Sequence, residues 1–214
     1  MPRRRADWLL GRITAKAVVA RAMQDVAPGE WPAKAIEVAS EPSGAPFARV
    51  APEAGRVRGF FPGERLPAAI SISHAEGRAL CAAAAWGPDR GLGVDLGAVE
   101  PRSPAFVETF LTPDEQRFVR DGPTAERDLR ANLVWGAKEA VLKALGVGLT
   151  VDTLELSCLP EPGAADPAAW PMSPADGGWR PFVARCGDEL VPGGGTIRGI
   201  WRPLDGFVGA LAAR

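Results

Sequence analysis

Two carboxylates and two lysines in this chain are spaced so that they could hold a metal ion beside a phosphate group. Asp95 follows Gly93-Val94, and about forty residues later a Trp-Gly-Ala-Lys-Glu-Ala-Val-Leu-Lys run occupies 135–143 and contains Lys138, Glu139 and Lys143. Mg²⁺ prefers oxygen ligands and usually takes one or two carboxylates from a protein, leaving its other positions to water and substrate phosphates. Lysines beside it would neutralise a phosphorylated substrate. Lysine is otherwise rare here, since the chain has it only at 16, 34, 138 and 143.

Helical spacing places part of the 135–143 run on one face. Trp135, Glu139 and Leu142 are three or four residues apart and share a stripe, and Glu139 precedes Lys143 by four residues. We interpret Trp135 as a core residue that aims Glu139. Lys138 points elsewhere, and it either lines the wall of a cleft or faces solvent. The competing interpretation of Glu139 and Lys143 is an exposed ion pair, which contributes only about 0.3–0.5 kcal/mol.

The segment around Asp95 is expected to be a strand. Alternation then places Gly93, Asp95 and Gly97 on one face and the apolar side chains of Leu92, Val94 and Leu96 on the other. The apolar face can pack in a core, while the glycines leave bare backbone on either side of the carboxylate, with room for an ion and a pyrophosphate. The alternative is an aspartate that bonds a turn at the end of a strand.

The elements that must position these residues follow from periodicity and from Gly, Pro and capping residues. The sequence predicts a helix over 7–23, loop with short strands over 41–67, and strands over 70–73, 79–86 and 92–96. It predicts a helix that begins at Ser103-Pro104 and a long helix over 124–145 that ends at Gly146. Residues 160–178 are expected to form an excursion, before further strands over 179–186, 196–202 and 207–212.

Taken together, the motifs resemble those of the 4′-phosphopantetheinyl transferases, specifically the larger type. That family has a Gly-(Val/Ile)-Asp segment followed by Trp-x-x-Lys-Glu-x-x-x-Lys at this spacing. Residues 8–16 are similar to its first helix, Ile70-Ser71-Ile72-Ser73-His74 to its Ser-x-Ser-His strand end, and 110–115 to the helix after the metal strand. Glu115 fits that helix, although a carboxylate at a helix start, favourable to the dipole, explains it equally well.

The resemblance implies a fold and a division of the chain. The fold is α+β, with two similar lobes related by a pseudo-twofold axis, each a small, mainly antiparallel sheet packed with a long helix. The N-terminal lobe would span 1–97 and the C-terminal lobe 98–214. An independent short enzyme and a domain cut from a longer protein, such as a polyketide synthase carrying its own transferase, both remain open.

The resemblance also implies an activity, which is transfer of 4′-phosphopantetheine from coenzyme A to a serine of an acyl or peptidyl carrier protein, releasing 3′,5′-ADP. Asp95 and Glu139 would hold Mg²⁺, Glu139 would be the base candidate, and Lys143 would clamp phosphates. The residues implied to contact coenzyme A are Arg12, Lys16, Ser73, His74, Lys138 and Lys143. For Arg12 and Lys16 the competing interpretation is a solvated helix face, and for His74 it is a hydrogen-bonded structural histidine.

Two positions depart from the family pattern. The family commonly has Asp-x-Glu at the metal strand, where this chain has Gly97, so water or Glu100 would have to fill the second position. The family often has Gly-(Lys/Arg)-Pro in its early loop, where this chain has Gly-Ala-Pro at 44–46. That phosphate contact is then lost or is supplied by Arg49 or Arg56.

Composition narrows the function classes. The formal net charge is −1, so no overall basic field indicates nucleic acid or a membrane surface, and the apolar stretches are too short for a membrane span. Three unclustered cysteines, Cys81, Cys158 and Cys186, indicate neither a disulfide framework nor a zinc site, and a reducing cytoplasm fits best. Two other function classes stay open: a catalytically silent coenzyme A-binding docking module of a megasynthase, and a different Mg²⁺-dependent phosphotransferase or hydrolase.

Overall fold

The computed structural model describes residues 2–85, 90–161 and 178–214. Its helices are α1 (Pro2–Val26), α2 (Pro104–Phe110), α3 (Pro113–Arg120) and α4 (Arg127–Leu145), with short 3₁₀ turns at 33–35, 124–126, 148–150 and 153–155. Its strands are β1 (Ile36–Ser40), β2 (Pro46–Val50), β3 (Ala69–Ala75), β4 (Arg78–Ala84), β5 (Leu92–Ala98), β6 (Leu156–Pro160), β7 (Arg180–Cys186), β8 (Gly195–Leu204) and β9 (Phe207–Ala213). All the strand pairs of this described part are antiparallel, so the fold is mixed α+β, as expected.

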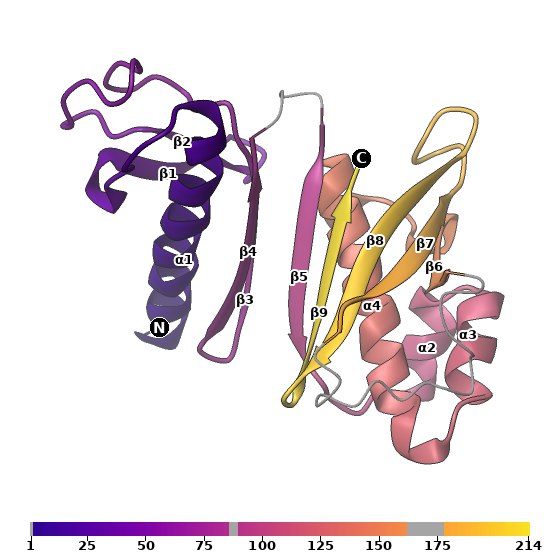
Figure 1. Ribbon diagram of the computed structural model, residues 1–214. Coiled ribbons are helices and arrows are strands. Elements are labelled where there is room, and N and C mark those ends of the chain that lie inside the picture. The colour runs from indigo at the N-terminus through magenta and orange to yellow at the C-terminus, as the bar shows by residue number, and fades with distance from the viewer. Residues whose placement is uncertain (1, 86–89, 162–177) are drawn as a thin grey trace.

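The N-terminal half consists of α1 and two hairpins. The β1–β2 hairpin and the β3–β4 hairpin form separate two-stranded sheets, and α1 packs along them (Figure 1). Their inward side chains, among them Val19, Met23 and Ile36, form one apolar cluster. The β3–β4 turn needs a left-handed backbone at Glu76 and Gly77, where φ is 50° and 78°. This half therefore contains two small sheets rather than the single small sheet expected.

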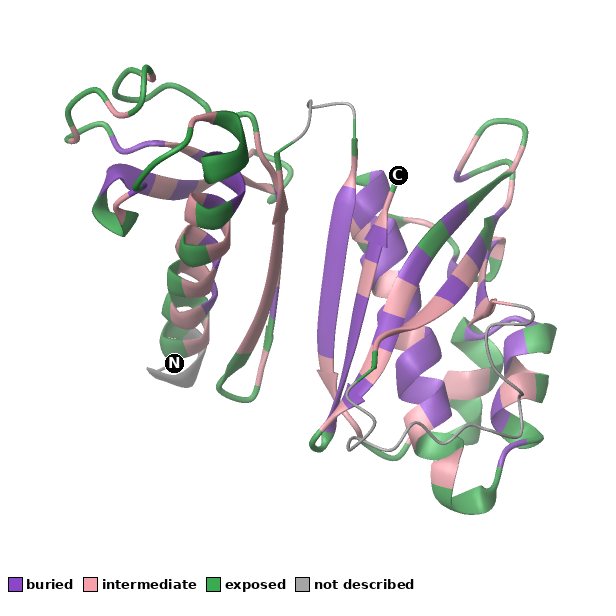
Figure 2. Ribbon diagram, viewed as in Figure 1, coloured by how far each residue is buried: buried purple, intermediate pink, exposed green. Residues whose placement is uncertain are grey.

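The C-terminal half is a five-stranded sheet in the order β5-β9-β8-β7-β6, with α4 lying across one face (Figure 1). Most residues of α4 are buried, as Figure 2 shows, because the helix packs against the sheet and α3. The side chains of α4 and the sheet form a second apolar cluster, which includes Val141, Phe182 and Trp201.

Strand β5 joins the two halves. Its backbone pairs with β9 on one side, and on the other side β3 lies against it (Figure 1). Since β5 belongs to the C-terminal sheet, a lobe boundary after Gly97 would cut a strand. We propose instead that the boundary falls between β4 and β5, and the pseudo-twofold relation of the lobes stays a prediction.

The predicted start of α2 and the predicted end of α4 agree with the structure. The Ser103 side chain accepts a hydrogen bond from the Phe106 amide at the start of α2, and α4 ends at Gly146, where φ is 75°. Helix α1 extends beyond 7–23 at both ends, and β6 and the individual limits of β1 and β2 were not predicted. Trp86, the expected end of one strand, and most of the expected 160–178 excursion lie outside the described residues.

Candidate functional site

The carboxylate of Asp95 lies where the two halves meet. Its Oδ1 accepts hydrogen bonds from Ser73 Oγ of β3 at 2.9 Å and from Lys143 Nζ of α4 at 2.7 Å. Asp95 and Ser73 are 6% and 8% exposed, so this contact is almost excluded from water. Three elements that are far apart in the sequence thus converge on one oxygen.

Glu139 lies beside Asp95, as the sequence predicted for a shared site. Burial raises the pKa of Glu139 above that of an ordinary glutamic acid, and the negative charge of Asp95 raises it further, while Lys143 acts in the opposite direction. The Lys143 ammonium stands 3.6 Å from Glu139 Oε2 and also donates to the Val94 carbonyl at 3.0 Å. One lysine therefore neutralises two neighbouring carboxylates.

The two glycines that flank Asp95 differ in their surroundings. A methyl group on Gly93 would lie 1.8 Å from the Ala140 carbonyl oxygen of α4, so this glycine allows strand and helix to pack closely. This corrects the expectation that Gly93 leaves open room for a ligand. At Gly97 the nearest atoms to such a methyl are Val208 Cγ2 at 3.9 Å and Asp95 Oδ2 at 4.0 Å, so space remains there.

The donor set fits Mg²⁺ better than a metal that needs many protein ligands. Within 2–85, 90–161 and 178–214 no group of three or more His, Cys, Asp or Glu side chains could hold a metal ion. The pair Asp95 and Glu139 offers two carboxylates, which is the number that Mg²⁺ usually takes from a protein. Two adjacent carboxylates, one buried and one partly buried, repel each other, and a bound cation would relieve that repulsion.

Lys138 is not at this site, which corrects the expectation that it lines a cleft or faces solvent. It is fully buried, and its ammonium donates to Glu115 Oε2 at 2.8 Å, to the Phe110 carbonyl at 2.9 Å and to the Thr153 carbonyl at 2.7 Å. Glu115 is equally buried, accepts from the Thr112 and Cys158 amides, and closes the capping box of α3. A lysine with all three donors satisfied in the interior has no contact left for a ligand.

His74 follows Ser73 and therefore faces the opposite side of β3, toward α1. Its ring lies near Gly11, since a methyl group on Gly11 would come within 3.4 Å of His74 Cδ2. Arg12 donates to Ser40 Oγ at 2.9 Å, and its guanidinium lies over the Trp8 ring. Burial lowers the pKa of Arg12.

Lys16 lies close enough to Glu37 of β1 to lower the pKa of that carboxyl, although the hydrogen bond from Arg49 is the larger cause. Its helix face thus turns toward β1 rather than toward the carboxylate pair. The structure therefore brings together Ser73, Asp95, Glu139 and Lys143. Arg12 and Lys16 of α1, and the side chain of His74 of β3, lie on the other side of β3.

Glu100, Arg49 and Arg56, which were expected to replace the family residues missing at Gly97 and Ala45, contact other groups in the structure. Glu100 pairs with Arg102 at 2.8 Å and is largely exposed. Arg49 makes two hydrogen bonds to Glu37, and Arg56 lies over the Phe61 ring and donates to the Gly59 carbonyl. These contacts do not support the compensating roles expected for Glu100, Arg49 and Arg56.

A cavity of about 410 Å³ opens between the two halves beside Lys143. Its wall is formed by Ala45 and Pro46 of the Gly-Ala-Pro loop, by the first residues of β3 and β5, and by the end of α4. Four cationic residues line it, and none of its described lining residues is acidic; the four are Arg65, Arg90, Lys143 and Arg214. The sequence analysis did not single out these arginines, because they are scattered over the chain and no spacing connects them.

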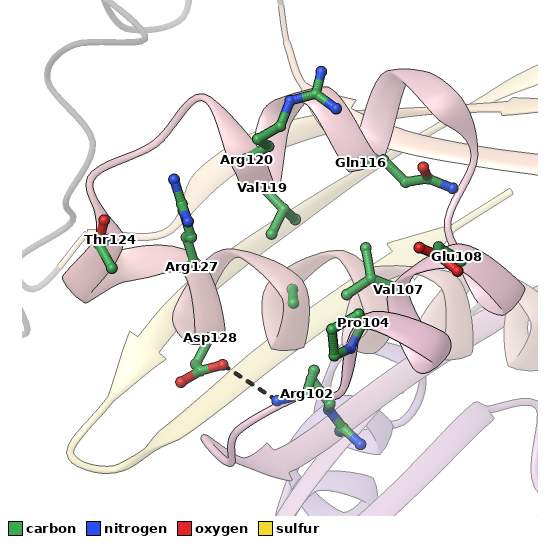
Figure 3. Close-up of a pocket in the computed structure, with 11 residues that line it drawn as sticks. Arg102, Pro104, Val107, Glu108, Gln116, Val119, Arg120, Thr124, Arg127 and Asp128 are labelled. Carbon is green, nitrogen blue, oxygen red and sulfur yellow. Dashed lines mark hydrogen bonds between the residues drawn. The ribbon is translucent and has the colours of Figure 1, made fainter.

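Another cavity, of about 480 Å³, lies between α2, α3 and α4 (Figure 3). Its wall carries both signs of charge, with Arg120 and Arg127 at one end and Glu108 and Arg102 toward the other, as Figure 3 shows. None of the residues predicted to act in the site lines this cavity.

Comparison with known proteins agrees with the motif-based assignment. Residues 91–179 match the family described as the 4′-phosphopantetheinyl transferase superfamily, and this segment contains Asp95, Glu139 and Lys143. Residues 91–179 are thus similar to a superfamily of transferases. Membership in the larger two-lobed type stays a prediction.

Two solved structures are similar to part of the chain. A holo-[acyl-carrier-protein] synthase from Thermotoga maritima is 22% identical, with 57% of this chain and 61% of that chain covered and a TM-score of 0.36. An apo-ACPS structure from Chronobacterium ammoiniagenes is 18% identical, with 58% and 94% covered and a TM-score of 0.35. The first alignment thus spans less than two thirds of the Thermotoga protein. Both scores are too low to argue from, and no curated protein is similar enough to count as a match.

Proposed function

We propose that this chain transfers the 4′-phosphopantetheine group of coenzyme A to a serine of an acyl or peptidyl carrier protein. The observation that supports it most is the convergence of Ser73, Asp95, Glu139 and Lys143 in a chain whose residues 91–179 match the transferase superfamily. The serine oxygen would form a bond to the phosphorus that bears pantetheine, and the bond from that phosphorus to the bridging oxygen would break. 3′,5′-ADP then leaves.

Asp95 and Glu139 are the residues that would hold Mg²⁺. The ion, when bound there, would neutralise the pyrophosphate oxygens and the charge that develops on the leaving group. Lys143 pairs with both carboxylates and lines the cavity, which supports the proposal that its ammonium would contact a phosphate oxygen of the substrate. Its fixed position would be part of orienting the pyrophosphate for displacement.

We assign the role of general base to Glu139, acting directly or through an ordered water. The serine proton must pass to a group within hydrogen-bond reach as the new bond forms. Burial and the negative charge of Asp95 raise the pKa of Glu139 in the metal-free protein, and a cation bound to both carboxylates would oppose that rise.

The cavity between the halves would take the phosphorylated part of coenzyme A. Its cationic lining and lack of acidic residues favour a polyanion, and Arg65 and Arg90 lie beside the loop in which the family's lysine or arginine is replaced by Ala45. The guanidinium of Arg65 is held in position by an ion pair with Glu41 and by its stacking on the Phe47 ring. We propose that these arginines replace the missing cation, while His74, Arg12 and Lys16 remain candidates for the nucleotide end.

Further proposals concern where the protein acts. Its three cysteines are free thiols, which fits a reducing cytoplasm. In the described part of the chain, no helix combines the length and the apolarity that a membrane crossing requires.

The intact mass of an apo-carrier protein tests the proposal. After incubation with the protein, coenzyme A and Mg²⁺, the carrier should gain one phosphopantetheine, and EDTA should prevent this gain. Asp95→Ala and Glu139→Ala should abolish the gain, whereas the control Asp205→Ala, which removes a carboxylate that is 97% exposed on the β8–β9 turn, should not.

Each failure has a distinct meaning. Full activity of either site variant, with folding confirmed by circular dichroism, would refute the metal-site assignment. No gain across several carriers, although coenzyme A binds, would overturn the transferase proposal in favour of the docking module.

A further inference from the structure

The hydroxyl of Ser73 connects the two halves of the molecule at Asp95. Its oxygen accepts a hydrogen bond from the Leu96 amide of β5 at 3.1 Å, and its hydrogen is donated to Asp95 Oδ1 at 2.9 Å. A serine hydroxyl has one hydrogen to donate. Ser73 therefore has no donor left for a coenzyme A phosphate, which is the role that the family resemblance implied for it.

The two oxygens of Asp95 are in different surroundings. Oδ1 already accepts from Ser73 Oγ and from Lys143 Nζ at 2.7 Å. Oδ2 lies near two glycines, Gly136 and Gly97. If these residues had side chains, their β-carbons would lie 3.4 and 4.0 Å from Oδ2. The serine and lysine donors thus gather on Oδ1, and beside Oδ2 two glycines contribute no side chain.

We propose that Ser73 is a positioning residue that fixes the rotation of the Asp95 carboxylate and presents Oδ2 as its metal-binding oxygen. Because Ser73 belongs to β3, the N-terminal half sets the geometry of a ligand that β5 contributes. This inference rests on the proposed function, in which Asp95 holds Mg²⁺. A hydrogen-bonded partner behind a ligand orients it, and its loss typically weakens metal binding by about 10- to 100-fold.

Ser71 provides a matched control on the same strand. It is buried like Ser73, and its Oγ accepts a hydrogen bond from the Val94 amide of β5 at 2.9 Å. The two serines therefore make equivalent bridges between the halves, but of the two only Ser73 also donates a hydrogen bond to the Asp95 carboxylate. A purely structural role would make the Ser71→Ala and Ser73→Ala variants behave alike.

The test measures Mn²⁺ binding by electron paramagnetic resonance, with coenzyme A present, no carrier protein, and correction for the Mn²⁺ that coenzyme A binds in free solution. Ser73→Ala should raise the Mn²⁺ dissociation constant by about 10- to 100-fold, and Ser71→Ala should leave it unchanged. Coenzyme A affinity in EDTA should be the same for both variants, because neither serine contacts the ligand in this proposal.

The outcomes separate this inference from the function on which it rests. If Asp95→Asn binds Mn²⁺ as the wild type does, the metal site itself is wrong. If Asp95→Asn loses the ion but Ser73→Ala retains wild-type affinity, the positioning role is refuted and the metal site stands. A loss of coenzyme A affinity in EDTA that is confined to Ser73→Ala would restore Ser73 as a ligand contact and overturn the proposal.

Discussion

Replacing Lys138 by methionine should destabilise this protein strongly, although Lys138 makes no contact with the proposed metal-binding carboxylates Asp95 and Glu139. Methionine has a similar length but no charge and no donor. The substitution leaves the buried Glu115 carboxylate and the carbonyls of Phe110 and Thr153 without the ammonium that now lies 2.7–2.9 Å from each. Removing one partner of a buried ion pair typically costs about 3–5 kcal/mol, a large part of the roughly 5–15 kcal/mol that stabilises a folded domain.

The loss should depend on pH. Burial raises the pKa of Glu115, and the charge of Lys138 is the largest influence that opposes this rise. Without Lys138 the folded-state pKa rises further. A carboxyl whose pKa is higher in the folded than in the unfolded state binds its proton more tightly when folded, so stability falls as pH rises from the unfolded value through the folded one. The Lys138→Met variant should therefore lose more stability at pH 8 than at pH 5.

Urea denaturation at both pH values measures the effect. The control is Lys34→Met, which removes an exposed lysine and should change the free energy of unfolding by less than about 0.5 kcal/mol. The double variant Lys138→Met/Glu115→Gln should regain part of the loss and most of its pH dependence, because the uncompensated charge is gone. A loss below about 1 kcal/mol, or one equal at both pH values, would refute the reasoning.

Two further predictions concern packing and thiol reactivity. Gly93→Ala should lower the free energy of unfolding by about 3 kcal/mol or more, because its methyl group would overlap the α4 backbone. Gly97→Ala is the control and should be tolerated, because its methyl group would meet only ordinary contacts. Equal urea midpoints for the two variants would contradict this account. Burial raises the pKa of Cys81 to about 11, so at pH 8 its alkylation by iodoacetamide should be far slower in the folded protein than in urea, as peptide mass analysis would show. Equal rates would mean that the Cys81 thiol is not shielded.

Much of the site could be predicted because its spacing is local. A helix places residues four apart on one face whatever surrounds it, so Glu139 and Lys143 had to lie together. Gly146 had to end that helix, because its left-handed backbone suits glycine best. Alternation along a strand also places Ser73 and His74 on opposite faces, although the family resemblance implied that both contact coenzyme A.

Lys138 could not be assigned from spacing. Its partners come from three other segments, namely Glu115 of α3, Phe110 of α2 and the 3₁₀ turn at Thr153. Whether a lysine between an alanine and a glutamate is exposed or enclosed depends on what packs over it, and that is a tertiary property. The same holds for the arginines of the cavity, which meet only when the two halves are assembled.

The sequence by itself determined the α+β class, the pairing of Glu139 with Lys143 and the motif spacing that resembles the transferase superfamily, because motif spacing and helix periodicity are carried by neighbouring residues. Only the tertiary structure decided that Gly93 is closed by α4, that Lys138 is interior, and that Ser73 and Lys143 share one oxygen of Asp95. Those facts depend on how β3, β5 and α4 approach one another. That approach is set by close packing between segments that the sequence does not place side by side.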